Sequence, residues 1–385
     1  MDVLRGFVLL GIFVMNIQSF AMPIAAYMNP TAYGDLTGAN LWVWVAGHLF
    51  FDQKFMTIFS MLFGAGILLM TDRAGEQGPR LHRRRMGWLI LFGLLHAHLL
   101  WYGDILYAYG MCGLAAYQFR AATIRDLVVA GSVLLLAGFA APLALAAAVP
   151  PAELVEIRDT DWKPLAHVIA QELAAYRGGL LDQAAHRSPE ALLFQTFYFL
   201  IFVVWKVLGL MLIGMALLRL DVLSARRAAG FYAKLAVAGF ALGLPVVAFG
   251  IWQNFRHGWS IEYSMFAGGR YNYWGSTLVS FGYIGAVMWM VRTGVMRPVA
   301  ARLAAVGRMA FTNYIFQSVV ATTLFYGHGF GLFGSVERTG QVAIVCAVWF
   351  VQLTASPIWL RHFHFGPLEW AWRSLTYGQF QKTKD

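Results

Sequence analysis

The chain has 385 residues, of which 59% are hydrophobic and only 12% are charged, and its formal net charge is +10. Soluble domains carry about 25% charged residues, so this composition excludes an ordinary soluble fold. Apolar runs of about 20 residues recur along the chain, and each is long enough to cross the hydrocarbon core of a bilayer. We therefore predict an all-α fold class, a polytopic membrane helical bundle.

About ten transmembrane helices are predicted. They fall near residues 6–28, 42–70, 87–101, 105–119, 127–149, 193–217, 231–252, 273–291, 304–326 and 341–360. The second is long enough to be tilted or broken, and the third and fourth form a tight hairpin because only a short link joins them. Pro142 is expected to kink the fifth span, and Pro150 with Pro151 to end it.

The positions of the basic residues predict how the spans are oriented. The connections on one side, with the C-terminal tail, hold 17 Lys and Arg residues, and those on the other side hold seven. Cytoplasmic connections carry the excess of positive charge, so we expect both termini to be cytoplasmic. This topology accounts for the positive net charge, and no nucleic-acid partner is expected.

Three parts are expected along the chain. Residues 1–149 form an N-terminal, catalytic-like half of five transmembrane helices, and residues 193–385 form a C-terminal half of five with a cytoplasmic tail. Residues 150–192 form an extracytoplasmic amphipathic connector, because apolar and polar residues alternate there at helical spacing. We expect one or two helices in this connector, acting either as a cap over an outward cavity or as a passive link.

Ionisable side chains within the spans are the main functional signal, since a charge at the bilayer centre costs roughly 2.5–3.5 kcal/mol. The second predicted span carries His48, Asp52 and Lys54, the first carries Asn16, and the third carries His96. We expect them to converge in one chamber in the outer half of the bundle. The alternative for each is a packing or ion-pair role without chemistry.

His48 and Asp52 are four residues apart and share one helix face. A carboxylate there can orient the imidazole as a general base for a hydroxyl or amine acceptor. Lys54 is expected to bind a phosphate or carboxylate, or to neutralise a carboxylate of another helix. His96 is the other histidine that we consider as the base, and Asn16 is a candidate donor to a developing oxyanion.

Binding residues are expected at both ends of the bundle. Arg83, Arg84 and Arg85 form a basic run that could hold an anionic donor at the cytoplasmic mouth, although such a run is also a topology signal. Candidate substrate-binding residues on the outer side are Trp101, Asp104, Glu262 and Arg270, the last two within an aromatic-rich stretch. No cluster has recognisable metal-ligand spacing, and we expect no metal.

Several strings, taken in order, resemble a known family: "DVLRGFVLLGIFVMNI", "QKFMTIFSMLFGAG", "LFGLLHAHLLWYGDILYAYGMCGL", "GRMAFTNYIFQS" and "GPLEWAWRSLTYG". The set is similar to the YeiB-like family of bacterial inner-membrane proteins, whose C-terminal half is a domain of unknown function. That family is grouped with transmembrane acyltransferases related to heparan-alpha-glucosaminide N-acetyltransferase. The resemblance implies a multi-pass protein of the bacterial inner membrane.

The resemblance also implies a reaction. An acyl group would move from cytoplasmic acyl-CoA, with acetyl-CoA as the first expectation, to an extracytoplasmic acceptor such as a sugar. A membrane-embedded histidine would be catalytic. Asn16 falls where heparan-alpha-glucosaminide N-acetyltransferase, a lysosomal enzyme, has an asparagine. Residues 29–41 contain no histidine at that enzyme's position, so the catalytic role would pass to His48 or His96.

Three functions remain open from the sequence. The first is the acyltransferase, with acyl-CoA, the acceptor and membrane lipid as partners and a homodimer as one assembly that it allows. The second is a transporter of a small anion, lipid or glycan intermediate, because intramembrane charges also serve substrate and proton paths. The third is a structural or sensory membrane protein in which the polar residues only pack.

Overall fold

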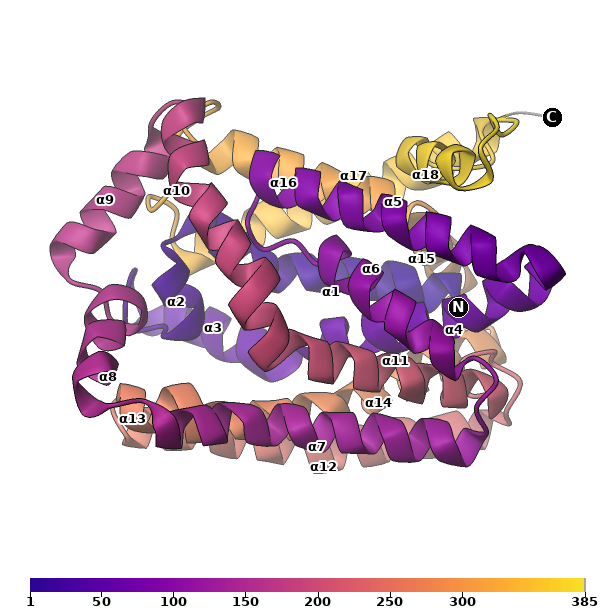
Figure 1. The fold of residues 1–385 in the computed structure, drawn as a ribbon, viewed down its shortest axis with the longest axis horizontal. Helices are drawn as coiled ribbons and strands as arrows, with labels where there is room; N and C mark the ends of the chain where they lie inside the picture. The colour runs from indigo at the N-terminus through magenta and orange to yellow at the C-terminus, as the bar shows by residue number, and fades with distance from the viewer. Residues whose placement is uncertain (384–385) are drawn as a thin grey trace.

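The computed structural model describes residues 1–383, and within that range the regular structure is entirely helical. The α-helices are α1 (Asp2–Ala21), α2 (Ile24–Met28), α3 (Gly38–Phe50), α4 (Lys54–Ala74), α5 (Gly78–Leu99), α6 (Leu106–Ala116), α7 (Ile124–Ala148), α8 (Pro151–Ile157), α9 (Ala166–Arg177), α10 (Leu180–Leu193), α11 (Val204–Arg219), α12 (Ala229–Arg256), α13 (Ile261–Tyr263), α14 (Gly269–Thr293), α15 (Arg297–Arg308), α16 (Ala310–Phe325), α17 (Arg338–His362) and α18 (Pro367–Tyr377). The long helices lie side by side, with α8 and α9 at one end and the N-terminus and α18 at the other (Figure 1).

Seven helical stretches within residues 1–383 are long and apolar enough to cross a membrane: Asp2–Ala21, Gly38–Leu99, Ile124–Ala148, Leu180–Arg219, Ala229–Arg256, Ile261–Thr293 and Arg338–His362. The second stretch contains α3, α4 and α5, and the fourth runs from α10 through the π-helical segment Phe194–Val203 into α11. Each predicted span overlaps a helix. Helices α6 and α16, with 11 and 16 residues, are shorter than any of these seven stretches.

Several predicted boundaries differ from the structure. The second predicted span is broken between α3 and α4, where Gln53 has a φ of 63°. The basic run lies on α5 rather than in a connection, because α5 already begins at Gly78. The connector holds three helices instead of one or two, since Pro151 begins α8 and a Gly178–Gly179 pair separates α9 from α10.

The two halves of the chain pack across one another. Helix α1 packs against α15, α16 and α17, and α4 packs against α11 and α14. The backbones of α4 and α11 touch at a pair of glycines: a Cβ on Gly64 would overlap the Met211 carbonyl, and one on Gly214 would overlap the Met61 carbonyl. Small residues allow such close approach between membrane helices. Residues from both halves therefore meet in the interior.

Candidate functional site

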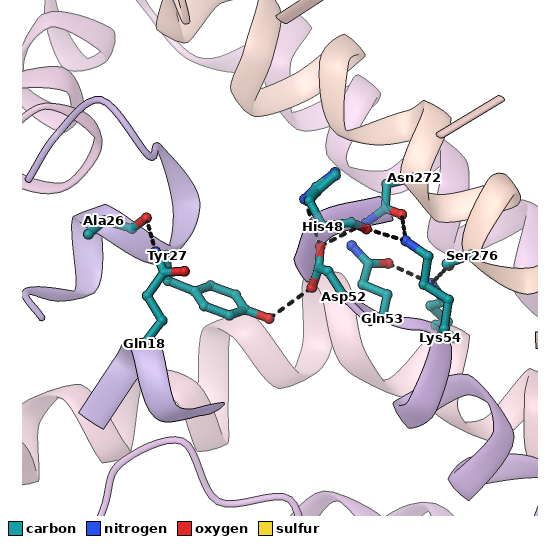
Figure 2. A network of polar contacts seen from close by, with 10 residues as sticks. Gln18, Ala26, Tyr27, His48, Asp52, Gln53, Lys54, Asn272 and Ser276 are labelled. Carbon is teal, nitrogen blue, oxygen red and sulfur yellow. Dashed lines mark hydrogen bonds and ion pairs between the residues drawn. The ribbon is translucent and has the colours of Figure 1, made fainter. Parts of the chain in front are cut away.

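The break between α3 and α4 carries the predicted His48–Asp52 pair. His48 Nδ1 lies 3.3 Å from Asp52 Oδ2, and the imidazole stacks on Trp44. Asp52 is buried and accepts two further hydrogen bonds, one from Tyr27 Oη at 3.0 Å and one from Asn272 Nδ2 at 2.7 Å (Figure 2). The carboxylate thus has three polar neighbours, from α2, α3 and α14.

Lys54 completes this cluster. Its ammonium is fully buried and donates to Asn272 Oδ1 at 2.7 Å and to the His48 carbonyl at 2.6 Å. The carbonyl is free to accept because the helical ladder stops at the break. Asn272 therefore bridges the buried cation and the buried carboxylate, as Figure 2 shows.

A second lysine extends the cluster toward α11. Lys206 Nζ donates to Gln53 Oε1 at 2.6 Å and to Ser276 Oγ at 3.3 Å, and it lies 4.4 Å from the centroid of the Tyr273 ring. Arg270 lies over the same ring and donates to the Phe266 carbonyl. We call His48, Asp52, Lys54, Lys206 and Asn272 the α3–α4 cluster.

His96 forms a separate pair. Its Nδ1 lies 2.9 Å from Asp104 Oδ1, and its Nε2 lies 2.9 Å from Ser318 Oγ on α16. The other Asp104 oxygen accepts from the Tyr107 backbone N–H at 2.8 Å. The side chains of His96 and Asp104 are each 1% exposed, so this pair is more deeply enclosed than His48 and Asp52, at 18% and 10%.

The polar residues therefore divide into two clusters, where the sequence predicted one chamber. Within residues 1–383, no hydrogen bond joins the α3–α4 cluster to the His96–Asp104 pair. The reason is the chain path: the α3–α4 break faces α11 and α14, whereas His96 on α5 faces α16. Asp104, predicted as a substrate contact, is instead engaged by His96.

An apolar cavity of about 200 Å³ ends beside the His96 pair. We call it the inner cavity. Its lining includes Leu9, Ile12, Phe59, Leu62, Phe63, Ile67, Leu89, Ile105, Tyr109 and Tyr314. The Tyr314 ring lies 5.1 Å from the His96 ring, and Ile105 is the neighbour of Asp104 in the chain. The pair thus lies directly behind the inner wall of this cavity.

At its other end the inner cavity adjoins a larger, basic space of about 850 Å³, which we call the vestibule. Both are lined by Arg5, Arg85, Arg308, Glu369 and Trp372, so they are contiguous. Five arginines line the vestibule: Arg5, Arg73, Arg85, Arg308 and Arg373. Such a concentration of guanidinium groups suits an anionic ligand that carries phosphates.

Two acidic residues also line the vestibule, and both have partners. Asp2 pairs with Arg5 at 2.9 Å. Glu369 accepts from the backbone N–H groups of Phe311 and Thr312, at 2.6 and 3.1 Å, and so caps the first turn of α16. Burial raises the pKa of the Glu369 carboxyl, against the lowering effect of the hydrogen bonds from Thr312 and Phe311. The guanidinium charge is thus largely unopposed.

Only one of the three predicted donor-binding arginines lines these spaces. Arg85 does so, with its guanidinium 4.3 Å from the Trp372 ring centroid. Arg84 donates to the Leu375 carbonyl and so holds α18 against α5, and Arg83 is exposed. Successive residues on a helix point about 100° apart, so a run of three cannot share one face.

With one exception, the remaining predicted residues make no hydrogen bond or ring contact with the His96 pair within residues 1–383. Trp101 is the exception: it is buried, packs edge-on to His96 and stacks on Phe20, and its indole N–H has no hydrogen-bond partner within residues 1–383. Asn16 is partly buried on α1. Glu262 is exposed, and Arg270 borders the α3–α4 cluster instead.

Four functional candidates escaped the sequence reasoning: Tyr27, Lys206, Asn272 and Ser318. The sequence could have indicated Lys206, because it is a cation within the predicted span 193–217, and Ser318, because it ends the string "GRMAFTNYIFQS". Tyr27 and Asn272 are neutral, and no sequence pattern indicates a functional role for them. In the part of the chain that the structure describes, no three His, Cys, Asp or Glu side chains are placed to hold a metal ion.

The fold and these clusters define a polytopic helical membrane protein with two buried histidine–aspartate pairs and a basic vestibule. Residues 217–379 match the family model described as "Protein of unknown function (DUF418)". Over 98% of its length the chain is 33% identical to the uncharacterized protein YeiB of Escherichia coli K12, covering 95% of that protein. It belongs to the YeiB-like family.

Other relatives are similar over their full extent. The uncharacterized protein YxaH of Bacillus subtilis 168 is 31% identical over 99% of this chain and 94% of its own length. An uncharacterized 39.9 kDa protein of Bacillus acidopullulyticus is 27% identical over 98% of this chain and 93% of its own. No solved structure matches the chain.

Proposed function

We propose that this protein is a membrane acyltransferase that moves an acyl group from cytoplasmic acyl-CoA to an extracytoplasmic acceptor such as a sugar. The observation that carries the proposal is the continuous space formed by the arginine-lined vestibule and the apolar inner cavity, whose wall at Tyr314 lies against the His96–Asp104 pair. Phosphates suit the arginines, and an uncharged pantetheine arm with its acyl group suits the apolar cavity.

In this proposal the donor enters from the vestibule. On α5, Arg85 and His96 are 11 residues apart, or about 16 Å along the helix axis. A CoA held by its phosphates at Arg85 would therefore direct its thioester toward His96. Acetyl-CoA is the first donor to consider, because the inner cavity has room for a narrow arm and a small acyl group.

His96 is the base that we propose, rather than His48. Its Asp104 partner fixes Nδ1–H, which leaves the Nε2 lone pair to accept a proton. His48 has an aspartate as well, but it stacks on Trp44, which lines neither space, whereas the Tyr314 ring beside His96 lines the inner cavity. Asn16, one helical turn beyond Ile12 of the cavity wall, stays a proposed oxyanion donor.

We also propose the finer topology: ten spans in the bacterial inner membrane, both termini cytoplasmic, and the vestibule open to the cytoplasm. The N-terminal residues and α18 line the vestibule together, which supports termini on one side. Membrane lipid surrounds the bundle in this arrangement, and a homodimer is compatible with it.

The proposal is tested by calorimetric titration of acetyl-CoA into the purified full-length protein in lipid nanodiscs. We expect binding, and we expect Arg85→Gln to weaken it roughly 10- to 100-fold, because one hydrogen bond to a charged group contributes about 1.5–3 kcal/mol. Arg83→Gln is the matched control, since Arg83 is exposed outside the vestibule, and should bind normally. A folded wild-type protein that binds no acyl-CoA would contradict the proposal.

A second function has its own supporting observation. The broken helix α3–α4, with buried Lys54 and Asp52 and partly buried Lys206, resembles the interrupted helices at which transporters bind ions and substrates. This arrangement favours a proton-coupled transporter of a small anion. Uptake or efflux that depends on Lys54, without acyl-CoA binding, would select this alternative.

A further inference from the structure

A third residue joins the His96–Asp104 pair. Ser318 lies in the middle of α16, where it is 1% exposed, and its Oγ is 2.9 Å from His96 Nε2. The other contact of this hydroxyl, to the Tyr314 carbonyl one turn back, is longer at 3.4 Å. His96 is therefore the main partner of the serine. A serine whose only role was to hydrogen-bond the carbonyl one turn back in its own helix would need no histidine beside it.

The hydrogen-bond directions follow from the acceptors. Both oxygens of Asp104 are occupied, one by His96 Nδ1 and the other by the Tyr107 N–H. A carboxylate only accepts, so Nδ1 of His96 carries the hydrogen, and in the neutral imidazole Nε2 then presents a lone pair. The Ser318 hydroxyl then donates to Nε2. This is the order in which a nucleophile, its base and an orienting acid occur in serine acyl-transfer enzymes.

The α3–α4 cluster offers an internal comparison. His48 also has an aspartate beside it, but within residues 1–383 no serine or threonine hydroxyl is hydrogen-bonded to its ring. In the part of the chain that the structure describes, the arrangement of hydroxyl, imidazole and carboxylate occurs only at the pair that lies behind the inner cavity. Tyr314 lines that cavity and precedes Ser318 by one turn of α16.

We propose that Ser318 is the nucleophile of a double-displacement acyl transfer, with His96 as its base and Asp104 as the residue that positions His96. This rests on the proposed function for its donor. The structure places the hydroxyl one helical turn beyond the cavity end, so a thioester reaches it when the Tyr314 side chain is displaced.

The two half-reactions balance. In the first, Ser318 Oγ bonds to the thioester carbonyl carbon while its proton passes to His96 Nε2. The C–S bond breaks, and the departing sulfur takes that proton, which leaves free CoA thiol and an acyl ester on Ser318. In the second, an acceptor hydroxyl or amine attacks the ester and gives its proton to His96. The proton returns to Ser318 Oγ as the ester C–O bond breaks.

An activated serine can be detected without knowing donor or acceptor. The purified full-length protein in nanodiscs is treated with diisopropyl fluorophosphate and analysed by peptide mass spectrometry. We expect an adduct on Ser318 and a labelling rate at least about a hundredfold lower in His96→Ala, the lower range for general-base catalysis. Ser60→Ala is the matched control: Ser60 is equally buried beside the cavity-lining Tyr109 but has no histidine partner, and labelling should not change.

The positioning role of Asp104 has its own comparison. Asp104→Asn should lose labelling by at least about a hundredfold while the unfolding temperature is maintained, because the amide can present the wrong group to Nδ1. Asp104→Glu should recover part of the rate. Equal labelling in the Asn and Glu variants would remove Asp104 from the proposal.

Access to the buried serine is controlled with Tyr314→Ala, which enlarges the cavity end. No adduct in either the wild type or this variant, with both folded, would overturn the nucleophile, as would undiminished labelling in His96→Ala. Acetyl-CoA-dependent transfer that survives in Ser318→Ala would also overturn it and leave the proposed function intact. Labelled Ser318 in a protein that binds no acyl-CoA would instead keep the nucleophile and remove the proposed donor.

Discussion

Glu172 shows how burial can be the largest influence on the pKa of a single residue. It lies on α9, in the segment between the two halves, and one of its carboxylate oxygens accepts from the Ile24 backbone N–H at 3.0 Å. Burial raises the pKa of this carboxyl to about 7, with Glu190 and Asp161 adding to the rise and the Ile24 hydrogen bond opposing it. The group ties α9 to the start of α2.

This raised pKa predicts a pH-dependent stability. Between about pH 4.5 and 7 the folded protein holds a proton on Glu172 that the unfolded chain releases, so the free energy of unfolding falls as pH rises. The contribution is about 3 kcal/mol over that range. Glu172→Gln keeps an acceptor for Ile24 without the charge, so its unfolding temperature should exceed that of the wild type at pH 8 and match it near pH 4.5.

Glu156→Gln is the comparison, because Glu156 is exposed on α8 in the same segment. Thermal unfolding of the detergent-solubilised proteins across the pH range should show no change in that variant relative to wild type. A Glu172→Gln curve parallel to the wild-type curve at every pH would contradict the assignment of the raised pKa.

Among the helices, α4 and α11 bring the backbones of the two halves into direct contact where they cross. It depends on Gly64 and Gly214, where an added methyl group would meet backbone carbonyls of the facing helix. Backbone atoms cannot rotate away as a side chain can, so a substitution there must separate the helices. The same two helices carry Lys54 and Lys206, which places the α3–α4 cluster at the end of this crossing.

Gly64→Ala is therefore expected to destabilise the protein by about 1–3 kcal/mol, the range for overpacking a filled interior. Gly66→Ala lies two residues along the same helix, where a Cβ would meet open space, and should be neutral or stabilising by up to about 1 kcal/mol. Thermal unfolding in one detergent measures both. An equal effect of the two substitutions would mean that helix propensity, and not the crossing, governs this position.

For the whole molecule, the proposed orientation places the vestibule in the cytoplasm and α8 to α10 outside. Two exposed positions at opposite ends of the bundle test it, Arg83 on α5 and Glu156 on α8. In a Cys346→Ala background, a membrane-impermeant maleimide should label Glu156→Cys in intact cells. It should label Arg83→Cys only after the inner membrane is opened. The reverse labelling pattern would show that the protein has the opposite orientation in the membrane.

Much of this architecture follows from local sequence pattern. Apolar runs predicted where the long helices lie, and the four-residue spacing predicted that His48 and Asp52 would meet. The run Arg83–Arg85 was predicted to lie in a connection, so the 100° rotation per residue of a helix was not considered there. The sequence therefore did not indicate that Arg85 alone would line the vestibule. Pattern within one segment also gives no information on distant partners: Asn272 is 220 residues from Asp52, and Ser318 is 222 from His96.

The bridge between Lys54 and Asn272 has a consequence for how the protein is made. The two residues are 218 positions apart, so at a synthesis rate of about 5–20 residues per second the lysine emerges roughly 10 to 40 s before its amide partner. During that interval the ammonium has the His48 carbonyl within its own segment but lacks its amide partner. The early helices thus cannot reach their final arrangement in the membrane until the ribosome has synthesised α14. The N-terminal half therefore completes its folding only together with the C-terminal half.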